Sequence, residues 1–326
     1  MTYLALLALD QRLPEAEDLD RLRRGNQIAE TTRQLFRGGR GNVKDDLERT
    51  NHESWRRVAA ARDLFDRVKF DGFPAPELAA ISAACAMILG NGNCGEHANA
   101  ATLIGARHLR PGETMSKVEA QRIDHVWPEL RADGAEPSRY DVVPDTWAVG
   151  APAFRGDSRF ASKPGATTVV FSVDKQNGQR YDLARQTEFD KLSTDPGALA
   201  FLDERLAARK MQTLNKKYIW PATPVVSDRF IATATKNIKY LQKRPNGPLL
   251  QQIVVAGAAR QLGSNVAQSA RADALFRPPA PRPGLRARLM QCLRYVRHLS
   301  ARSTSDSFGA CLGRPARHPS LDEAAG

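Results

Sequence analysis

The chain has 326 residues, 42% of them hydrophobic and 26% charged, so it is long enough for a substantial core and its composition excludes a largely disordered protein. Its formal net charge of +12 suits nucleic acid, an anionic membrane or an acidic protein as a partner, and does not choose among them. The four cysteines form no CxxC pair and no zinc-ribbon spacing, which argues against a disulfide framework, and no apolar run is long enough to cross a bilayer.

The N-terminal part is predicted to be mostly helical. Residues 1–36 place apolar side chains at roughly helical spacing, with a break near Pro14. The basic, glycine-rich segment 37–42 is typical of a turn, because its glycines match neither the Walker pattern nor the dinucleotide-binding fingerprint. Residues 45–70 have the pattern of one or two amphipathic helices. Residues 77–89 are alanine-rich and almost uncharged, which predicts a buried helix.

Cys94 stands at the start of the next predicted helix. It follows the sequence Gly-Asn-Gly-Asn and precedes an alanine-rich segment. A helix N-terminus carries partial positive charge and unpaired N–H groups, which favour a thiolate and can hold an oxyanion. We therefore interpret Cys94 as a candidate nucleophile, with its own N–H and the amide of Asn91 or Asn93 as oxyanion donors. Cys85 lies in the apolar run ISAACAMIL and is interpreted as an inert core residue.

Strands and then helices are predicted downstream of Cys94. Three strand-like runs, at 122–131, 139–143 and 167–173, predict a small antiparallel sheet beside the Cys94 helix. Proline breaks separate three further predicted helices, at 195–214, 225–242 and 249–262. The predicted fold class is therefore α+β, with helices flanking the sheet.

Proline and arginine dominate the end of the chain. Residues 271–326 hold ten arginines against four acidic residues and are expected to be a poorly ordered tail. Leucines and a valine between 285 and 299 fall on one face of a possible basic helix that would contact an anionic membrane, although a surface helix or a disordered tail is favoured. The tail lacks the interleaved aromatic side chains that stack on bases, which argues against nucleic acid as a partner.

The predicted organisation has three parts. A helical N-terminal region covers residues 1–75, and a catalytic region with a helical C-terminal part covers residues 76–270. The Pro/Arg-rich tail covers residues 271–326.

A thiol nucleophile needs a base, and His125 is the candidate. Strand alternation would place His125 with apolar neighbours and Asp124 on the opposite face, so Asp124 cannot easily orient the imidazole. Asp145, one short turn after the strand-like YDVV, is the favoured orienting carboxylate. Asp141 is the alternative, because a one-residue change of register or a bulge would exchange the two. Each residue also has an ordinary structural explanation, and it is the ordered trio that favours catalysis.

A metal site is the alternative interpretation of this region. His97 lies one helical turn after Cys94, and His125 would be the third ligand. Because no second ligand pair follows at zinc-like spacing, we favour a packing or capping role for His97 and expect no metal and no organic cofactor. Glu96 in the first helical turn is explained by the helix dipole.

Three motifs carry a family resemblance. GNCGEHA, DHVW and VVPDTWA, preceded by a helical segment, resemble the AvrPphE family of plant-pathogen type III effectors, also called HopX or XopE. The resemblance covers about residues 30–260 and implies a transglutaminase-like, papain-like core with a Cys-His-Asp triad. Carried over onto this sequence, it makes Cys94 the nucleophile, His125 the base and Asp145 the orienting carboxylate. The Pro/Arg-rich tail and an N-terminus that is not serine-rich depart from the family pattern.

The resemblance implies a bacterial protein that the type III secretion machinery delivers into plant cells, with the host cytoplasm as the expected location. There it would be a cysteine protease that acts on a host protein and alters immunity. A protein-glutamine transglutaminase or deamidase using the same site is the first alternative. A non-catalytic basic adaptor that binds an acidic partner is the second, and charge alone supports it.

Overall fold

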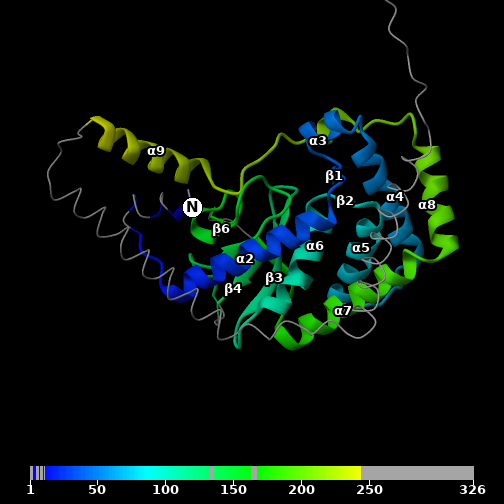
Figure 1. Ribbon diagram of the computed structural model, residues 1–326, viewed down its shortest axis with the longest axis horizontal. Helices are drawn as coiled ribbons and strands as arrows, with labels where there is room; N and C mark the ends of the chain where they lie inside the picture. The colour runs from blue at the N-terminus through cyan, green and yellow to red at the C-terminus, as the bar shows by residue number, and fades with distance from the viewer. Residues whose placement is uncertain are drawn as a thin grey trace, which may run out of the picture. The chain divides into compact units, whose positions relative to one another are not determined.

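The computed structural model describes Tyr3, Leu4, Leu7 and Asp10 and the ranges 12–132, 136–162 and 167–243. The chain divides into two units, Met1–Asp273 and Ala274–Gly326, and every described residue belongs to the first. The helix predicted over 249–262 and the tail predicted over 271–326 lie outside the described residues. The described part is α+β, as predicted, and combines helices with a five-stranded antiparallel sheet (Figure 1).

The first of these helices, α2 (Ala16–Leu35), begins at a capping interaction. The carboxylate of Asp18 accepts a hydrogen bond from the Glu15 N–H at 3.1 Å, one half of a capping box. The amphipathic run predicted over 45–70 forms two helices, α3 (Lys44–Arg49) and α4 (Glu53–Val68). The chain breaks between them because Asn51 and His52 both have positive φ, which no helix accommodates. Helical structure is thus confirmed over 16–35 of the predicted region 1–36, and 45–70 forms two helices, one of the two arrangements predicted.

The predicted buried helix is α5 (Ala75–Leu89). Pro74 precedes its first residue, where a fixed φ suits a helix start and no N–H is lost. Gly90 ends it with a φ of +66°, a left-handed conformation that glycine adopts at little cost. The chain then passes directly into the loop that precedes Cys94.

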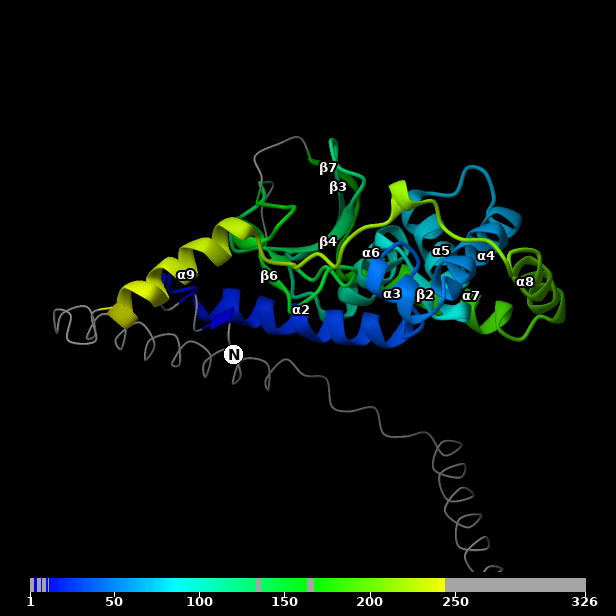
Figure 2. The same ribbon diagram turned by 90° about the horizontal axis from the view of Figure 1, so that it is seen from above.

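The central helix of the fold is α6 (Cys94–Gly105), which lies between the sheet on one side and α5 and α4 on the other (Figure 2). Its residues from Glu96 to Gly105 are all buried. Small side chains allow this close packing, and at Gly105 an added Cβ would lie only 2.8 Å from the Met115 sulfur. Because neighbours enclose α6 over most of its length, the position of its first residue, Cys94, is tightly determined.

The sheet has the strand order β6-β5-β4-β3-β7 and is antiparallel throughout (Figure 1). Its strands are β3 (Thr114–Ala120), β4 (Val126–Arg131), β5 (Val142–Val143), β6 (Ala153–Phe154) and β7 (Thr167–Val173). The strand predicted over 167–173 is confirmed. The run 122–131 is extended only from Val126, because the preceding residues form a turn in which the His125 N–H donates to the Ile123 carbonyl at 2.7 Å.

The strand β3 was not predicted, although it pairs with both β4 and β7. Its sequence, TMSKVEA, contains a lysine and a glutamate, and the pairing register with β7 shifts between Lys117 and Val118. Its polar and apolar residues do not alternate regularly along the strand, so the two-residue pattern on which strand prediction depends is weak. The centre of the sheet was therefore missing from the predicted elements.

A short parallel pair joins the basic segment 37–42 to the Cys94 loop. Strand β1 (Gly39–Arg40) pairs with β2 (Asn91–Gly92), and the Gly38 N–H donates to the Gly90 carbonyl at 2.8 Å. A Cβ at Gly38 would lie 2.3 Å from the Asn91 side chain, so the close approach requires glycine there. The glycine-rich segment is therefore a packed support for the Cys94 loop.

The C-terminal helices of the described part are α7 (Lys175–Leu192), α8 (Pro196–Ala208) and α9 (Asp228–Lys243). Helix α7 was not among the predicted helices, and α8 and α9 differ from their predicted boundaries of 195–214 and 225–242. Helix α7 begins after Asp174, whose carboxylate accepts a hydrogen bond from the Asn177 N–H at 2.8 Å. The helix predicted from 225 begins only at Asp228, because Val225 is hydrogen bonded to Val149 and Arg159 and Val226 forms an isolated bridge with Ser158. None of the helices in the described ranges is long and apolar enough to span a membrane.

The N-terminal helices share their core with the rest of the unit. One cluster of buried side chains draws on α4, α5, α6 and the end of α2, and contains Phe36, Ala61, Ala83, Ala86, Met87, Ala100 and Ile104. A second cluster fills the space between α6 and the sheet. Within the described residues, the predicted region 1–75 is therefore packed against the catalytic region and has no separate core.

Gly178 in the first turn of α7 offers a test of this packing. An added Cβ would lie 2.1 Å from the Cβ of Ala106, which cannot move aside. We expect Gly178→Ala to lower the free energy of unfolding by about 3 kcal/mol, despite the better helix propensity of alanine. Gly197→Ala is the matched control in the first turn of α8, where the new Cβ meets only the Asp195 carboxylate at 3.4 Å. Urea denaturation of both variants measures the difference, and equal stabilities would contradict it.

Candidate active site

Cys94 is the first residue of α6 and its side chain is partly accessible. Beside it, an added Cβ on Gly95 would meet nothing within 4 Å, so the start of the helix is open on that side. Cys85, in contrast, is fully buried in α5, and burial raises the pKa of its thiol to about 12, with a further contribution from the charge of Glu188. Of the two cysteines in the described ranges, only Cys94 is placed to react. Cys292 and Cys311 lie outside those ranges.

His125 precedes β4 and is buried, with 2% of its surface exposed. Its ring lies among aromatic side chains, with centroid distances of 4.1 Å to Phe160, 4.8 Å to Trp147 and 5.8 Å to Trp127. Its Nε2 is hydrogen bonded to Asp145 Oδ2 at 2.8 Å. The aromatic neighbours restrict rotation of the imidazole, so the hydrogen bond and the packing together determine its orientation.

Asp145 is the carboxylate that contacts His125, and Asp141 is not. Both remaining contacts of the Asp145 carboxylate are local, since its Oδ1 accepts hydrogen bonds from the N–H groups of Trp147 and Ala148 at 3.1 and 3.2 Å. Burial opposes ionisation of Asp145, but the charge and hydrogen bond of His125 outweigh it and lower the pKa of the carboxyl. Asp141 instead accepts hydrogen bonds from backbone N–H groups on either side of the β4 to β5 connection.

One nitrogen of the imidazole is left for Cys94. Because Asp145 occupies Nε2, Nδ1 is the nitrogen that remains, and it makes no aligned hydrogen bond with any described residue. Burial lowers the pKa of His125, but the charge and hydrogen bond of Asp145, followed by the interaction with Cys94, raise it to about 9. The imidazole therefore stands between a carboxylate and a thiol. Loose alignment between a thiol and its base is common before a substrate binds.

The protonation state of His125 is a testable consequence. Since its pKa in the folded protein lies above the ordinary value of 6.5, the stabilisation it provides is fully present below pH 6.5 and is lost as the pH rises to about 9. We expect imidazole NMR signals of His125 to remain those of the cation at pH 7 and to titrate near pH 9. In Asp145→Asn the midpoint should fall to 6.5 or below, because burial then dominates. A wild-type midpoint near 6.5 would contradict this assignment.

Two cations near Cys94 were missed from the sequence. Lys117 of β3 donates to Asn99 Oδ1 at 2.8 Å, and Arg62 of α4 binds both carboxylate oxygens of Glu96 at 2.8 and 3.2 Å. Burial lowers the pKa of Lys117, although the charges of Glu96 and then Cys94 oppose this. Arg62 has a raised pKa, because Glu96 and, more weakly, Cys94 outweigh its burial. Lys117 was missed because it lies on β3, the strand that was not predicted.

The proposed oxyanion donors differ in availability. The amide nitrogen of Asn91 donates to the Gly39 carbonyl at 2.9 Å and thus holds β1 against β2. The backbone N–H of Asn93 donates to Glu96 at 2.7 Å, but the side-chain amide nitrogen of Asn93 donates to no described residue. The Cys94 N–H and the Asn93 amide are therefore the available pair, while Asn91 has a structural role.

The side chain of His97 contacts Thr146 and Phe36, which does not favour a metal site shared with Cys94. Its Nδ1 lies 2.9 Å from the Thr146 hydroxyl, and its ring packs on Phe36 with a centroid distance of 4.5 Å. Within the described ranges, no three histidine, cysteine, aspartate or glutamate side chains converge on a position that would hold a metal ion. The contacts of His97 instead connect α6 to the segment that carries Asp145.

Comparison of the chain with protein-family models, with curated proteins and with solved structures finds no match. The function proposed for this protein therefore rests on the geometry of Cys94, His125 and Asp145.

Proposed function

We propose that this protein is a cysteine acyl-transfer enzyme with a transglutaminase-like, papain-like core, in which Cys94, His125 and Asp145 form the catalytic triad. The observation that carries the proposal is that Asp145 holds Nε2 of His125 and leaves Nδ1 free, while Cys94 is near enough to the same imidazole to help raise its pKa. A helix start for the thiol, an imidazole between thiol and carboxylate, and an open side at Gly95 support it.

The reaction follows from this arrangement. The Cys94 thiolate attacks the carbonyl carbon of a protein amide, and the oxyanion accepts hydrogen bonds from the Cys94 N–H and the Asn93 amide. The Nδ1 proton of His125 passes to the leaving nitrogen as the C–N bond breaks, which leaves a thioester and a free amine. Water or a second amine then attacks the thioester, gives its proton to Nδ1 and releases Cys94 as the C–S bond breaks.

The second step decides the product. Water completes proteolysis when the amide belongs to the backbone, and deamidation when it belongs to a glutamine side chain. An amine completes a crosslink. We favour proteolysis of a host protein, on the resemblance to the AvrPphE family. On the same basis, the protein is a type III effector of a plant pathogen, carried by the type III secretion machinery to the host cytoplasm.

A product assay tests the proposal. Purified full-length protein and its Cys94→Ala variant are incubated with casein, with and without a fluorescent primary amine, and the products are analysed by gel and mass spectrometry. Fragments indicate proteolysis, amine incorporation indicates crosslinking, and conversion of glutamine to glutamate indicates deamidation. Repeating the assay with plant-cell extract extends it to natural substrates. Products that are the same for wild type and Cys94→Ala would overturn the enzyme hypothesis.

A further inference from the structure

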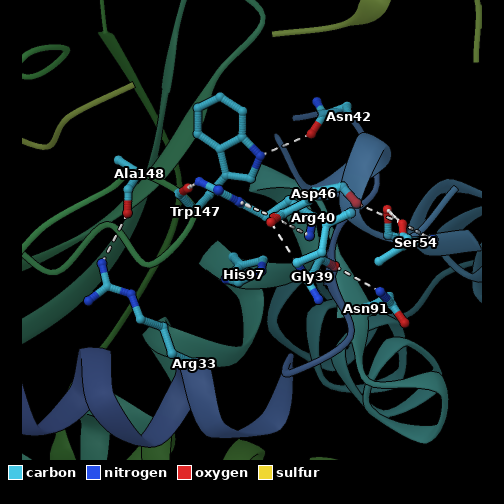
Figure 3. Close-up of polar contacts among 12 residues, drawn as sticks. Arg33, Gly39, Arg40, Asn42, Asp46, Ser54, Asn91, His97, Trp147 and Ala148 are labelled. Atoms are coloured by element: carbon cyan, nitrogen blue, oxygen red, sulfur yellow. Dashed lines mark hydrogen bonds and ion pairs between the residues drawn. The ribbon is translucent and has the colours of Figure 1, made fainter. Parts of the chain in front are cut away.

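A hollow of about 260 Å³ lies beside the segment that carries Asp145, and none of the three triad residues lines it. Its walls come from α2, β1, α6 and the segment after Asp145, and its polar side chains are Arg33, Arg40, Asp46, His97 and Thr146. Figure 3 shows Arg33 reaching up from its helix on one side of His97, with Gly39 and Arg40 on the other.

Arg33 brings a positive charge that no described carboxylate pairs with. Its Nε and Nη2 donate only to backbone carbonyls, those of Asp145, Thr146, Ala148 and Gly150, at distances from 2.6 to 3.4 Å. Its Nη1 donates to no described residue. Burial lowers the pKa of Arg33, and the nearby charge of Arg40 adds to this effect while Asp145 opposes it. An anion in the hollow would compensate this charge.

Arg40 supplies a second donor. Its Nε donates to Asp46 Oδ2 at 2.7 Å and its Nη1 to the Trp147 carbonyl at 2.7 Å, while its Nη2 donates to no described residue. Asp46 also lines the hollow, but its Oδ2 accepts from both Nε and the backbone N–H of Arg40, and its Oδ1 lies 3.5 Å from Arg49. Asp46 is therefore neutralised by its own partners, and Arg33 leaves the hollow with a positive excess.

His97 lines the hollow without adding charge to it. Burial lowers its pKa to about 4, so the imidazole is uncharged at neutral pH. Its Nδ1 lies 2.9 Å from the Thr146 hydroxyl, and its Nε2 is buried without any partner. When the hydroxyl donates to Nδ1, the proton of the neutral ring is on Nε2.

We propose that this hollow binds the phosphate group of a small phosphorylated molecule, through Arg33 Nη1 and Arg40 Nη2. A phosphate monoester offers three terminal oxygens to these two donors, and guanidinium groups match the geometry of phosphate better than an ammonium group does. The volume admits a phosphate group with a short carbon skeleton. The occupant would also join α2 and β1 to residues 145–150, since both arginines already hold carbonyls of that segment. The inference does not depend on catalysis by Cys94.

Binding of glycerol 3-phosphate to the full-length protein tests the proposal. Calorimetric titration at constant ionic strength is expected to show one site, with succinate binding at least tenfold more weakly. Hydrogen exchange should slow at the amides of residues 145–150 when the phosphate is bound. Equal affinity for succinate would overturn the choice of phosphate. Protection that appears elsewhere and not at 145–150 would overturn the site.

Two variants test whether the phosphate binds in this hollow. Arg33→Gln removes one donor and should weaken glycerol 3-phosphate binding at least tenfold. Val149→Glu provides a variant that keeps Arg33 and its carbonyl contacts, since Val149 lines the hollow with 48% of its surface exposed and a new carboxylate there would repel the ligand. Arg57→Gln is the control, because it removes the same charge from α4, outside the hollow. Loss of binding in Arg57→Gln, or unchanged binding in Val149→Glu, would overturn the proposal.

Discussion

Replacement of Cys94 by alanine is expected to abolish acyl transfer, with a loss of about 10⁴-fold or more in kcat. The reason is that no other described thiol can take over, since Cys85 is sealed in α5 and burial raises its pKa to about 12. The measurement is the initial rate of product formation from casein, together with peptide mapping after brief treatment with iodoacetamide at pH 7. In the wild type, the peptide that contains Cys94 should be alkylated faster than the peptide that contains Cys85.

Cys85→Ala is the matched control for this experiment. It removes a thiol of the same chain at a position with no contact to His125 or Asp145, and it leaves only a small cavity in the core. The expected result is a loss of about 1 kcal/mol in stability and an unchanged rate. Faster alkylation of Cys85 than of Cys94, or full activity in Cys94→Ala, is incompatible with the proposed nucleophile.

Asp145→Asn is expected to lower kcat by about 10²–10⁴-fold while KM changes little. The carboxylate raises the pKa of His125 and fixes which nitrogen faces Cys94, and an amide of the same size provides neither the charge nor the acceptor preference. The Asx-type contacts to Trp147 and Ala148 use Oδ1 and can persist in the variant, so the fold should be retained. Steady-state kinetics and far-ultraviolet circular dichroism measure the two effects separately.

Asp141→Asn is the matched control, since Asp141 was the alternative orienting carboxylate. It accepts hydrogen bonds from the N–H groups of Ala132 and Ser138 and has no contact with the imidazole. We expect this variant to lose some stability, because two buried donors are less well paired, and to keep its kcat. If Asp141→Asn lost activity and Asp145→Asn did not, the assignment of the triad would be wrong.

The position of His125 shows why local patterns were insufficient. Strand alternation over 122–131 predicted its direction, but His125 lies in the turn before β4, where the hydrogen bond to the Ile123 carbonyl and the ring contacts to Phe160 and Trp147 set its orientation. Those aromatic partners are distant in sequence. Asp145 is likewise positioned by its own turn and by Arg33, whose guanidinium holds the carbonyl of that residue at 3.4 Å.

The sequence alone determined those features that depend on neighbouring residues. Capping and breaking residues placed the start of α6 at Cys94 and the end of α5 at Gly90, and composition distinguished the buried Cys85 from Cys94. These are local preferences, and each acts over a few residues.

Only the tertiary structure decided which side chains meet. It selected Asp145 over Asp141, brought Lys117 and Arg62 near Cys94, and placed Arg33, Arg40 and His97 around one hollow. The physical reason is that long-range contacts depend on strand register, on bulges and on the depth to which helices pack, and a one-residue change in any of these redirects a side chain. Such choices are made by the packing of the whole unit, and no single segment of the chain contains them.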